Sequence, residues 1–333
     1  MCKVHLFCIN IKQLTQNCFV YISFTEENVE NIGKIEQVIM HLNSLFDMYV
    51  EDDSFQHHLL TQQQIDLKVR RFDKLHAQAG GNKIFKLTNW LSNIEEYKTV
   101  ISFGGAFSNH LLALSAVAKM LGIKSVGIIR GEKPVLFNHY LNAFVENGME
   151  LIFVSRTNYK GKTEIDFIND LKLRFPDSLI IPEGGAGERG IAGAQDMVNE
   201  IEPYDFIVLP CATGTTLAGV AAKNKNCEIL GFQVLKGENI IQNELTNSAN
   251  LVLSAFQKVS IITHYHFGGY AKVNGELLDF QQEIFESTQI PFDKVYGIKA
   301  IYGLFEEINK GKFKKNSRML YLHTGGTFDF INQ

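Results

Sequence analysis

A lysine that follows two glycines, Lys83 in the run Gly80-Gly81-Asn82-Lys83, has the type and setting that covalent chemistry needs. It begins a helical pattern that continues through Ile84-Phe85-Lys86-Leu87. A lysine at a glycine-rich helix start can be desolvated and lose its charge, and a neutral amine is what a Schiff base requires. Most lysines lie on solvated surfaces, so this chemistry depends on what surrounds Lys83.

Four residues with backbone and hydroxyl donors, Thr213, Gly214, Thr215 and Thr216, follow a β-branched run and open a helix. Hydroxyls and the first helical amides can surround a phosphate at the positive end of the helix dipole. A helix start capped by threonine is the alternative. The run lacks the lysine of a nucleotide-triphosphate P-loop, whereas Lys86, one turn after Lys83, can bring a positive charge to a phosphate.

The glycine-rich loop 104–110, which ends in Ser108, Asn109 and His110, has the same form. Ser108 and Asn109 are either ordinary helix caps or groups that face a bound carboxylate or an aromatic hydroxyl.

The segment 184–190 contains a formal G-x-G-x-x-G, made by Gly185, Gly187 and Gly190. A dinucleotide site also needs an acidic residue at the end of the next strand, and the nearest acid, Asp205, stands at the beginning of that strand. The sequence therefore disfavours dinucleotide binding.

Other kinds of catalytic site are poorly supported. His264 and His266 alternate as in a strand, but no third ligand of suitable spacing accompanies them, so we expect no metal. The chain has no G-x-S-x-G sequence, which disfavours a serine hydrolase.

The bulk composition narrows the partners and the compartment. A net charge of −4 argues against nucleic acid as a partner. The five cysteines form no C-x-x-C pair and suggest a reducing cytoplasm. The apolar runs fall short of the roughly 20 residues that span a bilayer, and the first 24 residues lack a signal-peptide cleavage pattern, so we expect a soluble protein without a membrane partner.

The elements that must position these loops alternate along the chain. The predicted strands are 99–103, 125–129, 151–154, 179–181, 206–209 and 229–234. The predicted helices are 110–121, 137–147, 164–175, 190–201 and 217–223. Short strands alternating with helices predict an α/β fold of doubly wound, mostly parallel sheets, in which ligands bind at the carboxyl ends of the strands. Residues 1–45 carry no motif and are interpreted as an N-terminal extension of uncertain role, with one amphipathic helix over 26–46.

Taken together, these loops resemble the fold-type II pyridoxal-phosphate family that contains 1-aminocyclopropane-1-carboxylate (ACC) deaminase and D-cysteine desulfhydrase. The resemblance runs from about Val69 to Phe328. The segments that carry it are 69–73, Gly81-Asn82-Lys83, 104–110, 127–132, Pro182-Glu183-Gly184-Gly185, 213–219, 265–272, Val295-Tyr296 and His323-Thr324-Gly325-Gly326.

The resemblance implies a two-lobed, tryptophan synthase β-like fold. A large cofactor-binding domain would comprise 46–87 and 186–333, and a small inserted α/β domain would comprise 88–185. The cofactor it implies is pyridoxal 5'-phosphate, and the active site would lie between the lobes. The family forms homo-oligomers, so a homodimer is expected.

The resemblance also implies residue roles. Lys83 would form the Schiff base, and Asn109 would donate to the phenolic oxygen of the cofactor. Thr213, Gly214, Thr215, Thr216 and Lys86 would hold the phosphate. Ser108, Tyr270 and Tyr296 would face the substrate. For the two tyrosines, packing in the core with a satisfied hydroxyl is the alternative.

One departure from the family bears on the reaction. In ACC deaminases a glutamate that faces the pyridine nitrogen follows the tyrosine at 296, and here that residue is Gly297. Thr324 can give the ring nitrogen a neutral hydrogen bond instead. A weaker electron sink favours β-elimination from a small amino acid, such as D-cysteine going to pyruvate, ammonia and sulfide. ACC deamination and a non-catalytic pyridoxal-phosphate-binding protein remain the alternatives.

Overall fold

The structure is a computed structural model that describes residues 5–8, 21–24, 50, 52–199, 201–224, 226–247 and 258–331. The chain forms two units, Met1–Tyr49 and Val50–Gln333. In the first unit, β1 (His5–Cys8) pairs antiparallel with β2 (Tyr21–Phe24). The helix predicted over 26–46 lies outside the described residues. Among the described residues, no helix is long and apolar enough to cross a membrane.

The larger of two sheets in the second unit has six strands in the order β11-β10-β9-β12-β4-β3. All neighbouring pairs are parallel except β3 and β4 at one edge. The strands are β3 (Asp52–Ser54), β4 (Asp66–Arg70), β9 (Phe206–Cys211), β10 (Glu228–Gln233), β11 (Val259–Ile262) and β12 (Arg318–Leu322).

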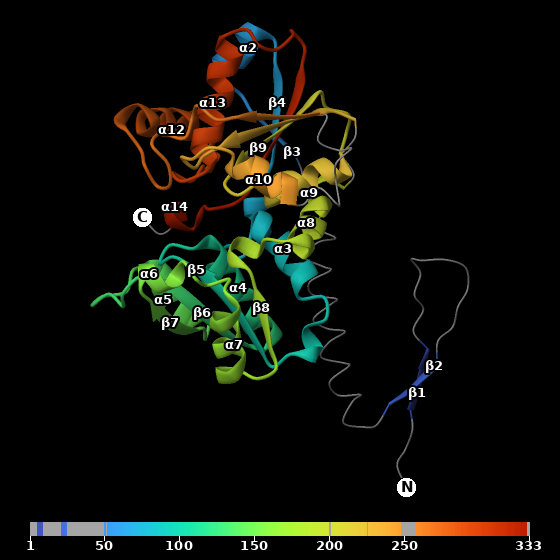
Figure 1. Cartoon of the computed structure of the whole chain (residues 1–333). Coiled ribbons are helices and arrows are strands. Elements are labelled where there is room, and N and C mark those ends of the chain that lie inside the picture. Colours follow the sequence, from blue (N-terminus) through green and yellow to red (C-terminus); the bar gives the residue numbers. More distant parts are fainter. Residues whose placement is uncertain are drawn as a thin grey trace. The chain divides into compact units, whose positions relative to one another are not determined.

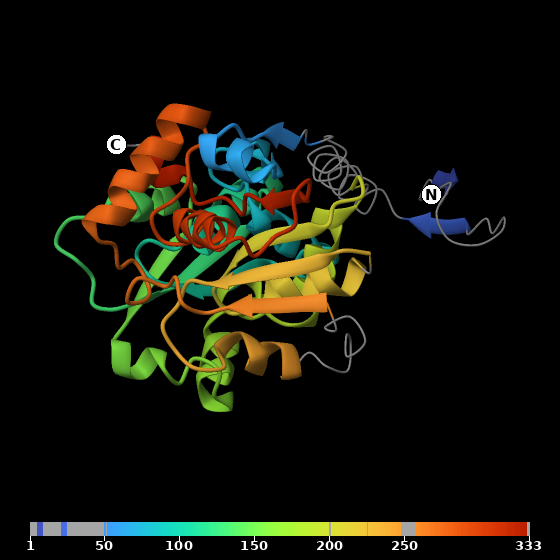
Figure 2. The same ribbon diagram turned by 90° about the horizontal axis from the view of Figure 1, so that it is seen from above.

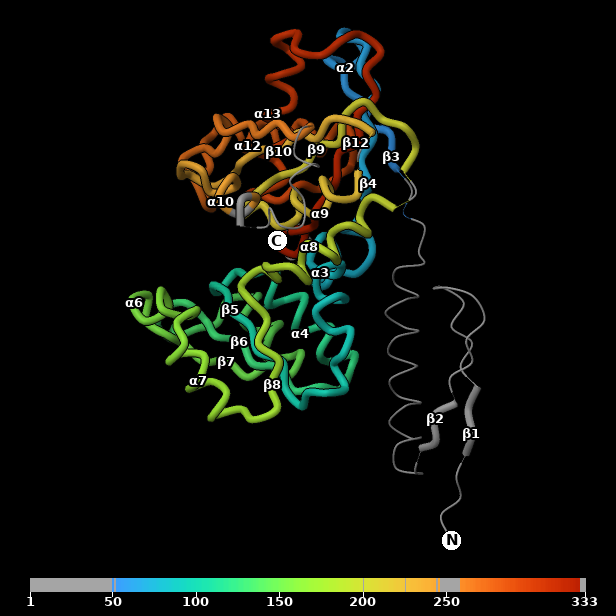
Figure 3. Tube along the Cα trace, turned by 45° about the vertical axis from the view of Figure 1, so that its right-hand side comes forward, coloured from blue at the N-terminus to red at the C-terminus, as the bar shows by residue number. Residues whose placement is uncertain are grey.

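The smaller sheet has four parallel strands in the order β7-β6-β5-β8. They are β5 (Thr99–Gly104), β6 (Lys124–Arg130), β7 (Glu150–Val154) and β8 (Ser178–Ile181). Every residue of β5 is buried, as expected for a central parallel strand that is covered on both faces. Figure 1 shows this sheet in the lower, green lobe and the six-stranded sheet in the upper lobe, and Figure 3 gives the same division along the Cα trace.

The helices lie between the strands along the chain and cover the sheets, as Figure 2 shows from above. Among the described residues of this unit, the α-helices are α2 (His58–Gln63), α3 (Asn82–Trp90), α4 (Asn109–Leu121), α5 (His139–Glu146), α6 (Arg156–Tyr159), α7 (Ile165–Arg174), α8 (Glu188–Ala194), α9 (Thr215–Lys223), α10 (Ile240–Asn247), α12 (Gly275–Thr288), α13 (Gly297–Asn309) and α14 (Phe328–Ile331). The same part of the chain contains the 3₁₀ turns η1 (Phe72–Leu75), η2 (Ile94–Glu96), η3 (Glu183–Gly185) and η4 (Gln195–Val198).

The prediction of a helix over 190–201 is wrong at the carboxyl end, because the helix ends earlier than predicted. Helix α8 stops at Ala194, η4 follows, and Asn199 is already extended. The amide of Asn199 donates to the backbone oxygen of Asp196, and its side chain donates to Oδ1 of Asp196. Such local hydrogen bonds offer the backbone an alternative to the helix. The other helices and strands predicted between residues 99 and 234 are present, with ends that differ by one or two residues.

The glycines of the formal G-x-G-x-x-G serve turns and close packing. Gly187 has a φ of +90°, and a Cβ atom at Gly190 would lie 1.8 Å from the backbone oxygen of Gly185. Asp205 accepts the backbone N–H of Arg318 at the amino ends of the strands, away from the ligand-binding edge. These contacts explain the glycine pattern without a dinucleotide.

Candidate active site

A cavity of about 350 Å³ lies where loops from the ends of both sheets meet. Its walls include the segments that follow β5, β8, β9 and β12, the position expected for a ligand site in parallel α/β folds. The cavity brings together every site residue that the sequence predicts: Lys83, Lys86, Ser108, Asn109, Thr213, Gly214, Thr215, Thr216, Tyr270, Tyr296 and Thr324.

Lys83 lies in the first turn of α3 and is half-buried. Its Nζ donates to Oδ1 of Asn82 at 2.6 Å. Desolvation lowers the pKa of Lys83 to about 8, although the charge of Asp293 opposes this shift. Roughly a tenth of the amine is therefore neutral at pH 7, and the neutral form is the one that attacks a carbonyl.

The position of Lys83 depends on a close approach between the loops that follow β4 and β12. The amide of Asn82 donates to the backbone oxygen of Thr324 at 3.1 Å. Gly81 has a φ of +83°, and a Cβ atom there would lie 2.2 Å from that same oxygen. Only glycine meets both conditions, so Gly81 is required for the cavity to form.

The start of α9 presents a set of phosphate-type donors. Gly214 adopts a φ of +111° and is followed by the first turn of the helix at Thr215 and Thr216. Nδ2 of Asn82 donates to Oγ1 of Thr216 at 2.9 Å, which links the lysine loop to this turn. Lys86 is buried in the same wall and approaches the backbone oxygen of Gly184 at 3.4 Å. The donors and the positive charge suit an anionic group.

The loop that opens α4 contributes Ser108, Asn109 and His110. Ser108 is the N-cap, and its Oγ accepts the N–H of Leu111 at 3.2 Å. Its own O–H remains a donor toward the cavity. Oδ1 of Asn109 accepts the hydroxyl of Tyr140 at 2.8 Å.

His110 is a functional candidate to which the sequence did not assign a role. Because Oγ of Ser102 donates to the backbone oxygen of Ile181, the Nε2–H of His110 must donate to Ser102, 2.7 Å away. Nδ1 is then a buried acceptor that has no hydrogen-bond partner among the described residues. Desolvation, followed by the charges of Lys83 and Lys86, lowers the pKa of His110 to about 3. His110 is therefore neutral. Its position directly after Asn109 was the feature of the sequence that could have indicated its place at the cavity.

Tyr270 and Tyr296 pack edge-on in the cavity wall, with ring centroids 6.3 Å apart. Burial holds the pKa of Tyr296 well above its usual value, and Tyr270 and Asp293 add to this shift. Burial also raises the pKa of Tyr270. Both hydroxyls therefore stay protonated. Because the two side chains are also hydrogen-bonded to each other, one of the two protons is left for a substrate.

Asp293, to which no role was assigned from the sequence, lies beside Tyr296 at the start of α13. Its carboxylate accepts the backbone N–H groups of Val295, Tyr296 and Gly297 at 2.7–2.9 Å. Burial raises the pKa of Asp293, and these three hydrogen bonds oppose the shift. An aspartate a few residues before a helical pattern is a helix-start signal that could have revealed this cap.

Two charged residues at the cavity also went without a role in the sequence. Arg130, at the end of β6, lies over the ring of Tyr159 at 5.9 Å, and Glu183 pairs with Lys162 at 3.4 Å. Glu183 is the only acidic residue among the described residues that line the cavity. The wall formed by Tyr296 and Thr324 thus presents no carboxylate.

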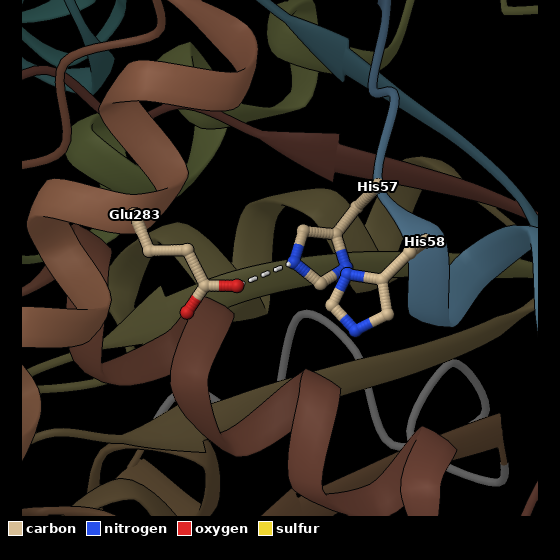
Figure 4. A group of neighbouring side chains, drawn as sticks. All are labelled: His57, His58 and Glu283. Carbon is tan, nitrogen blue, oxygen red and sulfur yellow. Dashed lines mark hydrogen bonds and ion pairs between the residues drawn. The ribbon is translucent and has the colours of Figure 1, made fainter.

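Apart from the cavity, the residues His57, His58 and Glu283 form a cluster of residue types that can bind a metal (Figure 4). The sequence did not predict this cluster. Nε2 of His57 lies 3.1 Å from Oε1 of Glu283. Nδ1 of His57 accepts the N–H of Leu59 and caps α2, so the ring proton sits on Nε2 and points at the glutamate. A metal at Nε2 would need the other tautomer and would break the cap. The contacts explain this cluster as a helix cap with a hydrogen-bonded carboxylate.

The cavity fits a phosphorylated aldehyde of moderate size. An amine of lowered pKa and a phosphate-type turn line the same cavity. The family model described as pyridoxal-phosphate dependent enzyme matches residues 70–325. The chain belongs to this family. The protein is therefore a pyridoxal-phosphate-dependent enzyme.

Relatives of this enzyme carry two activities in their names. A Pyrococcus horikoshii protein, provisionally named 1-aminocyclopropane-1-carboxylate deaminase, is 28% identical over 278 residues, which cover 78% of this chain and 84% of the relative. An Arabidopsis thaliana protein, named bifunctional D-cysteine desulfhydrase/1-aminocyclopropane-1-carboxylate deaminase, mitochondrial, is 27% identical over 302 residues, or 80% of this chain and 75% of the relative.

Solved structures share the architecture. The structure of an ACC deaminase homologue matches with a TM-score of 0.71 and 25% identity, over 87% of this chain and 97% of that one. Serine racemase from Dictyostelium discoideum, at 16% identity, matches with a TM-score of 0.61 over 87% of this chain and 97% of that chain. The enzyme thus has the fold-type II architecture of two mostly parallel sheets covered by helices, as the sequence predicts.

Proposed function

We propose that this enzyme is a deaminating lyase that eliminates the β-substituent of a small D-amino acid, with D-cysteine as the model substrate. The overall reaction converts D-cysteine and water to pyruvate, ammonia and hydrogen sulfide. This choice rests on the wall at Tyr296 and Thr324. The carboxylate of Asp293 there accepts backbone amides, and no acidic side chain of the described residues lines this wall.

The wall composition favours elimination for an electronic reason. Pyridoxal phosphate, when bound, withdraws electrons from the α-carbon of the substrate. A carboxylate beside the ring nitrogen strengthens this withdrawal by keeping the nitrogen protonated, whereas the hydroxyl of Thr324 offers a neutral hydrogen bond. A departing β-substituent relieves the charge on the α-carbon, so elimination needs less help from the ring than opening of a cyclopropane does.

The residue roles form one arrangement in this proposal. Lys83 holds the cofactor covalently and, once released, takes the α-proton, which its pKa of about 8 permits. Thr213, Gly214, Thr215 and Thr216 bind the phosphate with Lys86, and Asn109 donates to the phenolic oxygen. Ser108 and the amides at the start of α4 bind the substrate carboxylate.

The two tyrosines complete the arrangement. The protonated hydroxyls of Tyr270 and Tyr296 orient the β-substituent, and one of them donates as the carbon–sulfur bond breaks and the electron pair leaves with sulfur. We also propose two domains, a large one formed by 46–87 and 186–333 and a small one formed by 88–185. The enzyme is further proposed to be a homodimer and to be located in the cytoplasm.

A substrate panel tests the reaction. The cofactor-loaded enzyme is assayed with D-cysteine, L-cysteine, β-chloro-D-alanine and ACC, with sulfide, chloride, pyruvate and 2-oxobutanoate as readouts. We expect pyruvate from the β-substituted D-amino acids. Turnover of ACC to 2-oxobutanoate without turnover of any β-substituted D-amino acid would show the ring-opening alternative to be correct.

A further inference from the structure

A buried tyrosine from α5 contacts the start of α4 at the cavity wall. The hydroxyl of Tyr140 donates to Oδ1 of Asn109 at 2.8 Å. The side chain of Tyr140 is almost fully buried, and burial, followed by the charges of Asp329 and Asp293, raises its pKa far above the usual value. The hydroxyl therefore stays protonated and remains a donor at every physiological pH.

This hydrogen bond decides which end of the Asn109 carboxamide faces the cavity. A carboxamide has an oxygen that only accepts and a nitrogen that only donates. Because Oδ1 is held by Tyr140, the NH₂ group is the end that remains for a ligand. Rotation of the amide by half a turn would present the oxygen instead, which repels an electron-rich phenolic oxygen.

The ring of Tyr140 is itself fixed by aromatic side chains from two other segments. Phe107, from the loop before Asn109, packs edge-on with centroids 5.8 Å apart. Phe328, the first residue of α14, packs edge-on at 5.0 Å. Asp329, the next residue of α14, accepts from Nε2 of His139 at 2.6 Å, and His139 precedes Tyr140 in α5. This cluster ties the loop of Asn109 to the segment that follows Thr324, Gly325 and Gly326.

We propose that Tyr140 is a positioning residue that fixes the amide of Asn109, so that its NH₂ group is presented to the phenolic oxygen of pyridoxal phosphate. The proposal rests on the role proposed above for Asn109. The phenolic oxygen is negatively charged, and this charge loses its neighbouring positive charge when the nitrogen of the Lys83–cofactor linkage gives up its proton. A hydrogen-bond donor at the phenolic oxygen stabilises that deprotonated form. Removal of the donor therefore raises the pH at which that linkage titrates.

The experiment is a double-mutant cycle with Tyr140→Phe and Asn109→Ala, read without substrate. The visible absorption of each cofactor-loaded protein is titrated with pH, and the dissociation constant of pyridoxal phosphate is measured by fluorescence. For both single variants we expect the titration midpoint to rise by about one pH unit, the scale of one hydrogen bond to a charged group. We expect the double variant to match Asn109→Ala, because Tyr140 acts through Asn109.

Tyr204→Phe is the matched control, because it removes one buried hydroxyl that donates to Asp52 at 3.1 Å, in the large sheet region and outside the cavity lining. Its midpoint should equal that of the unmodified enzyme. Asn109→Asp provides an independent arm. The carboxylate of that variant would keep an acceptor for Tyr140 but lose the NH₂ donor, so its midpoint should rise at least as far as that of Asn109→Ala.

The possible results test two claims separately: that Tyr140 positions Asn109, and that Asn109 binds the phenolic oxygen. A wild-type midpoint in Tyr140→Phe, or a Tyr140→Phe shift that persists in the Asn109→Ala background, overturns the positioning role. A wild-type midpoint in both Asn109→Ala and Asn109→Asp shows that Asn109 does not bind the phenolic oxygen, which refutes this inference and that part of the proposed site. Cofactor attachment and turnover in the substrate panel then decide separately whether the rest of the proposed function stands.

Discussion

The amide nitrogen of Gly297 lies 2.8 Å from Oδ2 of Asp293, and a Cβ atom at position 297 would come within 3.0 Å of the same oxygen. The carboxylate of Asp293 therefore occupies the space beside the first residue of α13. Gly297 has no positive φ that demands glycine, so the crowding by Asp293 and Phe292 is what favours glycine here.

Gly297→Glu is expected to destabilise the protein in a pH-dependent way. The Cβ atom must displace a neighbour, at a cost of about 1–3 kcal/mol, and the second carboxylate lies near Asp293. Like charge raises the pKa of Asp293 further above its unfolded value, so the folded state binds the proton more tightly and stability falls as pH rises through that pKa. Urea unfolding from pH 4 to 8 measures this.

Gly297→Ala separates crowding from charge in that experiment. The alanine variant adds the same Cβ atom without a carboxylate, so its loss of stability should depend much less on pH. Equal pH dependence for the glutamate and alanine variants would contradict the electrostatic argument.

Reconstitution of the cofactor-free enzyme should become faster as pH rises and level off above about pH 8. Only the neutral amine of Lys83 attacks the aldehyde, and its pKa is about 8. Stopped-flow absorbance from pH 6.5 to 9.5 with excess pyridoxal phosphate gives the rate. Lys83→Ala should show no covalent band. A rate that still rises about tenfold per pH unit at pH 9.5 would mean that Lys83 is not desolvated as the structure indicates.

Thr216→Val is expected to weaken binding of pyridoxal phosphate by about 10-fold or more, the scale of one hydrogen bond to a charged group. The hydroxyl of Thr216 accepts from Asn82, so its own proton is available to the phosphate. Pyridoxal, which lacks the phosphate, should bind the variant and the unmodified enzyme alike. Thr288→Val is the control, since that hydroxyl donates to Ile284 within α12. An equal loss for pyridoxal would place Thr216 away from the phosphate.

Lys299→Met is expected to reduce kcat/KM by about 10-fold or more through the loop of Tyr270, with little change in cofactor affinity. Nζ of the fully buried Lys299 donates to the backbone oxygens of His266 and Gly269, at 3.0 and 2.6 Å. These bonds hold the residues before Tyr270 against α13, which begins directly after Tyr296. Steady-state kinetics with D-cysteine and cofactor titration measure both effects.

The exposed Lys294, on the loop before α13, provides a matched lysine-to-methionine control for that variant. Lys294→Met should keep the unmodified kcat/KM. A comparable loss of cofactor affinity in Lys299→Met would show that Lys299 supports the whole cavity and not the Tyr270 loop alone.

The sequence by itself determined the alternating fold and the loops of the site. Strand runs followed by glycine-rich turns specify local conformation, because glycine and helix-capping residues act within a few neighbours in the chain. For this reason Asn109 and Thr213 to Thr216 could be predicted to lie at helix starts that follow strands, and Lys83 at a glycine-rich helix start. The end of helix α8 could not, because local hydrogen bonds around Asp196 and Asn199 compete with a helical pattern of similar strength.

Only the tertiary structure decided which side chains set the electrostatics and orientation of those loops. Lys299 comes from α13 and Tyr140 from α5, and each contacts a segment outside its own helix. The charge of Asp293, before α13, acts on Lys83 in α3. The pKa of Lys83 likewise depends on burial by loops that follow several strands. Desolvation and amide orientation arise from contacts across the fold, which neither residue type nor spacing specifies.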